Sequence, residues 1–91
     1  MIILEEKKLL KVKDLKIIDH IGTFYASILG KGIWRMDDSA YVVLKLCDGT
    51  RTIDEISGTI AKKTKLAFDD VKMTVKNIID ELERLKFIEY V

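Results

Sequence analysis

The hydrophobic pattern of this chain changes its period once, at Asp37-Asp38-Ser39. Before this point apolar and polar residues alternate, as in Thr23 to Leu29, where Phe24, Ala26 and Ile28 would share one face of a strand. After it, apolar residues recur every three or four positions, which is typical of amphipathic helices. The switch predicts an α+β domain in which a small antiparallel sheet comes first and three helices follow.

Two glycine-containing turns divide the first half into strands. Ile17 to Ile21 is short and β-branched, and Gly22 separates it from the strand that starts at Thr23. Gly30-Lys31-Gly32 can adopt the positive φ of a tight loop, and Ile33-Trp34-Arg35-Met36 follows as the returning strand. This half therefore predicts a small antiparallel sheet.

Two short helices are expected next. Ala40, Val43, Leu44 and Cys47 form an apolar stripe, and Gly49 is placed where a left-handed C-cap belongs. The segment Thr52-Ile53-Asp54-Glu55 matches a capping box and starts the second helix, whose buried stripe is Ile53, Ile56 and Ile60.

A third, longer helix is expected from about Asp69-Asp70 to Leu85. Its apolar seam is Val71, Val75, Ile78, Leu82 and Leu85, and Phe87 to Val91 then returns to an extended pattern. Strands, three helices and a strand-like tail follow the order of a winged helix-turn-helix domain with its sheet placed first.

The chain's size and charge restrict its function. It has 91 residues, 48% of them hydrophobic and 34% charged, with a formal net charge of +1. This composition predicts one small folded domain, over residues 17–91, behind an N-terminal arm or strand at residues 1–16 whose period is unclear. A deep active site is not expected, so we predict that the protein is not an enzyme. The balanced charge gives no general attraction to nucleic acid or to a membrane.

The reactive residues are few. Cys47 is the only cysteine and His20 the only histidine, which excludes an internal disulfide and predicts no metal site and no cofactor. Cys47 is expected to pack in the core, and Asp37-Asp38 and Asp69-Asp70 to serve as helix starts. The sequence shows no export signal or membrane anchor in its first residues, so a cytoplasmic location is expected.

The third helix leaves more than one function open. Lys72, Lys76 and Asn77 are plausible contacts to DNA, although Asp80, Glu81 and Glu83 follow on the same helix. Alternatively, Ile79 and Val75 widen the apolar stripe, and one edge of it is expected to stay partly open. If the strand Ile33 to Met36 ends the sheet beside this helix, an extended peptide could add there as a further strand. Ile79 and Trp34 could instead complete the core.

The segment from Leu44 to Ile56 reads Leu-Lys-Leu-Cys-Asp-Gly-Thr-Arg-Thr-Ile-Asp-Glu-Ile. An apolar helix ending in Asp-Gly-Thr-Arg-Thr, followed by apolar-x-Glu-Ile, resembles the pyrroloquinoline-quinone biosynthesis protein D (PqqD) family. The likeness extends over about residues 17–90. It includes Leu85-Lys86-Phe87-Ile88, which follows the family's Leu-x-Gly-Leu-Ile ending with Lys86 in the place of the glycine.

The resemblance implies a small winged-helix chaperone that recognises the leader of a ribosomally made precursor peptide. It would present that peptide to a modifying enzyme, often a radical S-adenosylmethionine protein. In the family the leader adds beside the third strand and packs against the third helix. This nominates nine peptide-binding residues: Ile33, Trp34, Arg35, Met36, Val71, Lys72, Val75, Lys76 and Ile79.

Alternatives to this function are a winged-helix transcription factor and a small module that forms homodimers through its exposed strand. The resemblance implies two partners, the precursor peptide and its modifying enzyme. Neither a membrane nor a nucleic acid is expected as a partner. The resemblance further predicts that Ile79→Asp weakens peptide binding and leaves the fold intact.

Overall fold

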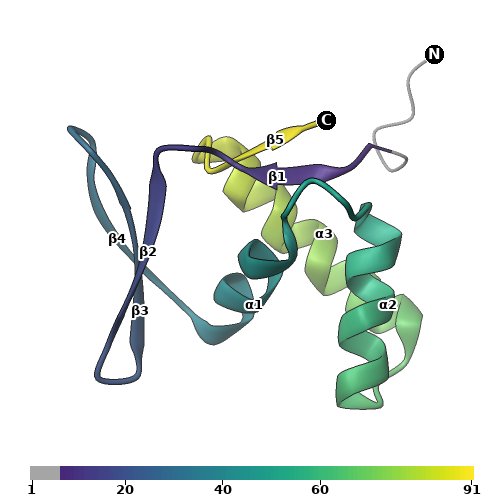
Figure 1. The fold of residues 1–91 in the computed structure, drawn as a ribbon. Helices are drawn as coiled ribbons and strands as arrows, with labels where there is room; N and C mark the ends of the chain where they lie inside the picture. Colours follow the sequence, from purple (N-terminus) through teal and green to yellow (C-terminus); the bar gives the residue numbers. More distant parts are fainter. Residues whose placement is uncertain (1–6) are drawn as a thin grey trace.

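A computed structural model describes residues 7–91, and the part of the predicted arm at residues 1–6 lies outside the described residues. The elements are β1 (Leu9–Lys11), β2 (Leu15–His20), β3 (Thr23–Ile28), β4 (Gly32–Met36), α1 (Asp38–Leu46), α2 (Ile53–Thr64), α3 (Phe68–Arg84) and β5 (Ile88–Tyr90) (Figure 1). The α+β class is confirmed, with an antiparallel sheet ahead of three helices.

The larger sheet has the order β2-β3-β4, with both neighbouring pairs antiparallel. The predicted alternation in β3 is confirmed: Ala26 is fully buried, and Phe24 and Ile28 pack against the core. Ala26 pairs with Ile17 on one side and with Trp34 on the other, so these three residues form an inward-facing row.

The turns of this sheet lie at the glycines that the sequence indicated. Ile21 and Gly22 both have positive φ, 52° and 78°, in the two-residue turn between β2 and β3. Such a pair matches the turn geometry that fits the twist of a hairpin. Gly30, in the loop between β3 and β4, and Gly32, the first residue of β4, also have positive φ.

β1 is held on both of its edges. On one side it pairs with β5, with Leu10 opposite Glu89. On the other side it bonds to the loop between α1 and α2: Leu9 N–H donates to the Arg51 carbonyl at 3.0 Å, and Gly49 N–H donates to the Leu9 carbonyl at 2.8 Å. Leu9 and Leu15 are 0% and 1% exposed. The segment before Ile17 thus supplies two core residues to the same fold.

The starts of the first two helices are capped as the sequence predicts. Asp37 Oδ1 accepts a hydrogen bond from Ala40 N–H at 2.7 Å, and Thr52 and Glu55 form the complete capping box of α2. The end of α1 differs from the prediction, because the helix stops at Leu46 and its C-cap is Cys47. The reason is that residues 47–51 bond to β1, so the positive φ of Gly49, 86°, serves the following turn.

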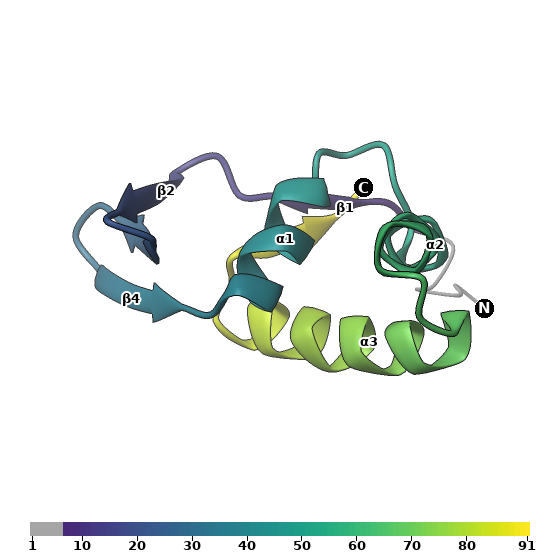
Figure 2. The same cartoon turned by 90° about the horizontal axis from the view of Figure 1, so that it is seen from below.

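The helices form a layer beside the larger sheet. In Figure 2, α3 runs along the side of the molecule past α1 and α2, and the turn from β4 into α1 lies near its C-terminal half. α3 packs against both α1 and α2. The core between them includes Val43, Leu44, Ile56 and Phe87, each at most 1% exposed.

Candidate functional site

The strand β4 lies at an edge of the larger sheet, because β3 is its only neighbour among the described strands. Its residues alternate between two environments. Trp34 and Met36 face inward, and the Trp34 ring meets the Phe87 ring edge-on at 5.2 Å between centroids. Ile33 is 67% exposed, and Arg35 is exposed as well. The outer edge of β4 therefore offers backbone N–H and C=O groups to another strand.

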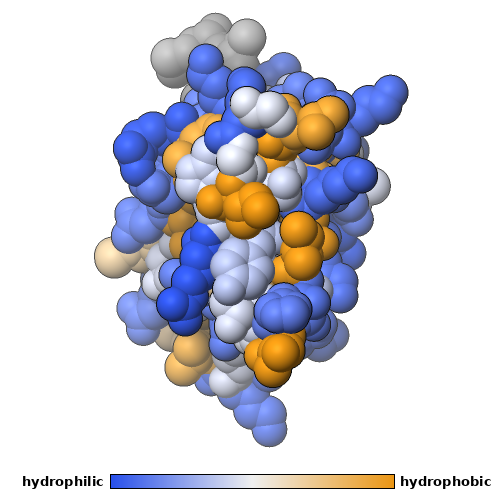
Figure 3. All heavy atoms as spheres, turned by 90° about the vertical axis from the view of Figure 1, so that its left-hand side faces the viewer, coloured by the Kyte–Doolittle hydropathy of each residue, from blue (hydrophilic) through white to orange (hydrophobic). Residues whose placement is uncertain are grey.

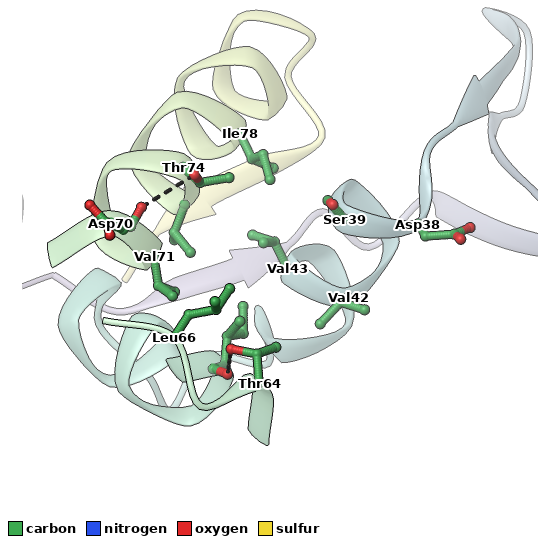
Figure 4. Close-up of a pocket in the computed structure, with 12 residues that line it drawn as sticks. Asp38, Ser39, Val42, Val43, Thr64, Leu66, Asp70, Val71, Thr74 and Ile78 are labelled. Carbon is green, nitrogen blue, oxygen red and sulfur yellow. Dashed lines mark hydrogen bonds between the residues drawn. The ribbon is translucent and has the colours of Figure 1, made fainter. Parts of the chain in front are cut away.

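An apolar cavity of about 370 Å³ lies between the three helices (Figure 4). Its wall is formed almost entirely by aliphatic side chains from all three helices and the loop before α3: Val42, Val43, Ile60, Leu66, Val71, Val75 and Ile78. Val42 and Leu66 are 42% and 62% exposed, so large apolar side chains at this cavity are open to solvent. Asp38, Ser39, Thr64, Asp70 and Thr74 supply its polar margin.

A second, shallower hollow lies at the end of β4, beside the turn between β2 and β3. It is lined by Gly22, Thr23, Arg35, Met36, Asp37 and Asp38. Asp38 also lines the helical cavity. The chain passes directly from β4, through Asp37, into α1, so the end of the edge strand lies next in sequence to Asp38 and Ser39 of the cavity lining.

Other apolar surface lies on the sheet, but it is not gathered into one patch. Figure 3 shows the sheet side of the molecule, where hydrophobic areas are separated by hydrophilic ones. Ile18 and Ile33 are 42% and 67% exposed, and Ile21 and Leu29 are exposed in the two turns. The helical cavity is thus the more enclosed apolar site.

Of the three apolar residues predicted on α3, two line the cavity and one does not. Val71 and Val75 line it. Ile79 is 1% exposed and part of the core, so the alternative that Ile79 completes the core is confirmed and the expectation of a partly open edge there is wrong. Its neighbour Ile78, expected in the core seam, is partly buried and lines the cavity instead. Adjacent helix residues lie about 100° apart, so the packing of α1 and α2 on α3 decides which of the two is enclosed.

The two predicted lysines line neither the cavity nor the shallow hollow. Lys72 Nζ lies 2.8 Å from Asp54 Oδ1, and the Lys72 side chain is 27% exposed, so this lysine is directed toward α2. Lys76 is exposed on α3 and is not a lining residue of the cavity. Arg35 is the predicted cation that lines the shallow hollow.

Sequence reasoning missed several residues of the cavity, among them Val42, Leu66 and Asp38. Val42 and Leu66 carried a signal, because each is a large aliphatic residue outside the predicted stripes. Asp38 was interpreted as part of a helix start, which the structure bears out, since it lies in the first turn of α1. Asp38 also lines both hollows. This could not be predicted, because it depends on how the sheet packs against the helices.

Cys47 has the environment of a core residue. Its side chain is buried, its Sγ donates to the Val43 carbonyl at 3.3 Å, and burial raises the pKa of the thiol to about 12. The nearby Asp48 carboxylate also raises this pKa. A thiol with so high a pKa is protonated at neutral pH and is a poor nucleophile. The prediction that Cys47 packs in the core is confirmed.

The Asp-Gly-Thr-Arg-Thr segment, residues 48–52, organises the loop that holds β1. Asp48 accepts hydrogen bonds from Thr50 Oγ1 at 2.5 Å, from Thr50 N–H at 3.0 Å and from Arg51 Nη1 at 2.6 Å. The bonds from Thr50, with the charge of Arg51, lower the pKa of the Asp48 carboxyl. The segment by which the sequence resembles a known family is thus a structural turn.

A model of the family described as "Coenzyme PQQ synthesis protein D (PqqD)" matches residues 4–88, nearly the whole chain. The chain belongs to the PqqD family. This membership supports a role in the biosynthesis of PQQ or of another ribosomally made, modified peptide. No curated protein and no solved structure matched this PqqD-family chain. In residues 7–91, no helix is long and apolar enough to cross a membrane.

Proposed function

We propose that this PqqD-family protein is a non-enzymatic chaperone that binds the leader of a ribosomally made precursor peptide. The peptide adds to the free edge of β4, and the protein then presents it to a modifying enzyme, for example a radical S-adenosylmethionine protein. The observation that supports this proposal best is that an edge strand with a free side, β4, runs directly into the helix α1 whose first turn lines the apolar cavity.

Two contributions to binding follow from this arrangement. Backbone hydrogen bonds to β4 would fix the register of the peptide without reading its sequence. The cavity would read its sequence, because an aliphatic side chain placed between Val42, Leu66 and Ile78 leaves water for an apolar surface. A volume of about 370 Å³ is in the range of small-ligand sites and can hold more than one such side chain.

The same surface gives little support to DNA binding. A recognition helix needs free basic side chains, but Lys72 is paired with Asp54 on α2. Asp80, Glu81 and Glu83 are exposed further along α3 and would repel phosphates. We therefore keep DNA as a comparison in the test.

The test is a two-dimensional NMR titration of the labelled protein with leader peptides encoded beside its gene. Peptide binding should shift the amides of residues 32–39 together with those near the cavity, including Ile78 and Leu66. A short DNA duplex at moderate salt should leave these signals unchanged. Shifts on α3 with DNA alone would instead favour a transcription factor.

A cavity-filling variant makes this test specific. Thr74→Trp places a large ring at the margin of the cavity, because Thr74 is exposed and lines it. It should weaken peptide binding by about tenfold, which corresponds to about 1.4 kcal/mol of lost apolar contact. Met73→Trp is the matched control, since Met73 is 67% exposed on the same helix and does not line the cavity. Equal affinities of the two variants would argue against the cavity as the peptide site.

A further inference from the structure

The charged side chains that line the cavity are both carboxylates. Asp38 lies in the first turn of α1 and Asp70 in the first turn of α3, toward opposite ends of the cavity (Figure 4). Within residues 7–91, the lining includes no Lys or Arg. The lysines of the α2 end, Lys63 and Lys65, flank the lining residue Thr64 without being lining residues themselves.

Of the two aspartates, Asp38 is the better placed to select a bound peptide. It lines both the shallow hollow beside β4 and the cavity, so a chain that passes from one to the other goes by its side chain. Asp38 is exposed, and its neighbour Asp37 caps α1. The Asp38 carboxylate is thus available to a cation on a bound peptide. Arg35 lines the shallow hollow but not the cavity, so Asp38 is the charged residue that the two share.

We infer that this site selects peptides in which an aliphatic anchor residue is flanked by Lys or Arg. Asp38 is the main specificity determinant, on the β4 side of the anchor, and Asp70 is the second, on the far side. The inference rests on the proposed function, because it requires a peptide whose side chain occupies the cavity. It adds the charge pattern of the peptide to the strand pairing and the apolar anchor.

The first experiment is a selection of random displayed peptides against the full chain. Peptides that also bind Thr74→Trp are removed in each round, so those that remain depend on the cavity. The inference predicts enrichment of Lys or Arg within a few positions of an aliphatic residue. Enrichment of Asp or Glu would assign the selection to the cations Arg35, Lys63 and Lys65 and overturn the inference, and so would a lack of any charge preference.

The second experiment measures the affinity of one selected peptide for charge variants. Asp38→Asn should weaken binding about fivefold at low salt, in the range of exposed charge pairs. The loss should vanish near about 1 M salt, where the Debye length is about 3 Å. Asp69→Asn is the matched control, because Asp69 lies in the first turn of α3 but does not line the cavity.

The outcomes separate this inference from the function on which it rests. Peptides that depend on the cavity but bind wild type, Asp38→Asn and Asp69→Asn equally would reject the role of Asp38 and leave the proposed function standing. If no peptide survives the removal step, because every binder of the wild type also binds Thr74→Trp as tightly, the proposed function itself is rejected, and this inference with it.

Discussion

Lys86 occupies a backbone conformation that glycine adopts more easily. Its φ is 62°, in the turn that ends α3. Lys86 N–H donates to the Glu83 carbonyl and Phe87 N–H donates to the Leu82 carbonyl, both at 2.9 Å. These two bonds are the Schellman arrangement, in which the residue with positive φ is usually glycine. The geometry gives a physical reason for the glycine in the corresponding ending of the PqqD family.

Replacing Lys86 by glycine should therefore stabilise the protein. Lys86→Gly relieves the steric cost of a left-handed side-chain residue and is expected to raise the free energy of unfolding by about 1 kcal/mol. Urea unfolding followed by circular dichroism measures this change. Lys76→Gly, in the middle of α3, is the matched control and should lower the free energy of unfolding by a similar amount. An unchanged or lower stability of Lys86→Gly would contradict the assignment of strain to this turn.

Among the elements, those with a local pattern could be predicted from the sequence and β1 could not. The capping box at Thr52, the glycine turns and the apolar stripes each involve residues that are close together in the sequence. They can therefore be recognised without knowledge of the fold. β1 has only three residues, and its partners lie in residues 47–51 and 87–91. Its strand conformation arises from these distant contacts, and three residues are too few to show a period.

The buried position of β1 leads to a prediction about truncation. A chain that begins at Ile17 lacks Leu9 and Leu15, which are 0% and 1% exposed, and lacks the strand that bonds the loop at Gly49. Loss of a buried leucine side chain costs about 2–5 kcal/mol, against a total stability of about 5–15 kcal/mol for a typical domain. The truncated chain should lose the circular dichroism spectrum of the folded full chain. A folded chain from Ile17 would show that β1 is dispensable.

At the scale of the whole molecule, the candidate site could be predicted only in part. The edge strand at Ile33 to Met36 and the contribution of Val71 and Val75 followed from the sequence and the family resemblance. The cavity did not, because its wall takes residues from three helices whose mutual packing no local pattern encodes. The same packing determines that Ile79 is enclosed and that Ile78 borders the cavity.

The adjacent pair Ile78 and Ile79 can therefore separate folding from binding. Ile79→Asp would bury a carboxylate without a partner in a site that is 1% exposed, so it should unfold the protein, contrary to the expectation from the sequence. Ile78→Gln changes a partly exposed side chain at the cavity, so it should keep the fold and weaken leader-peptide binding about tenfold, or about 1.4 kcal/mol. Circular dichroism and a peptide titration on the same samples give both results. A folded Ile79→Asp variant, or full affinity in Ile78→Gln, would contradict the packing of α3 on which the site depends.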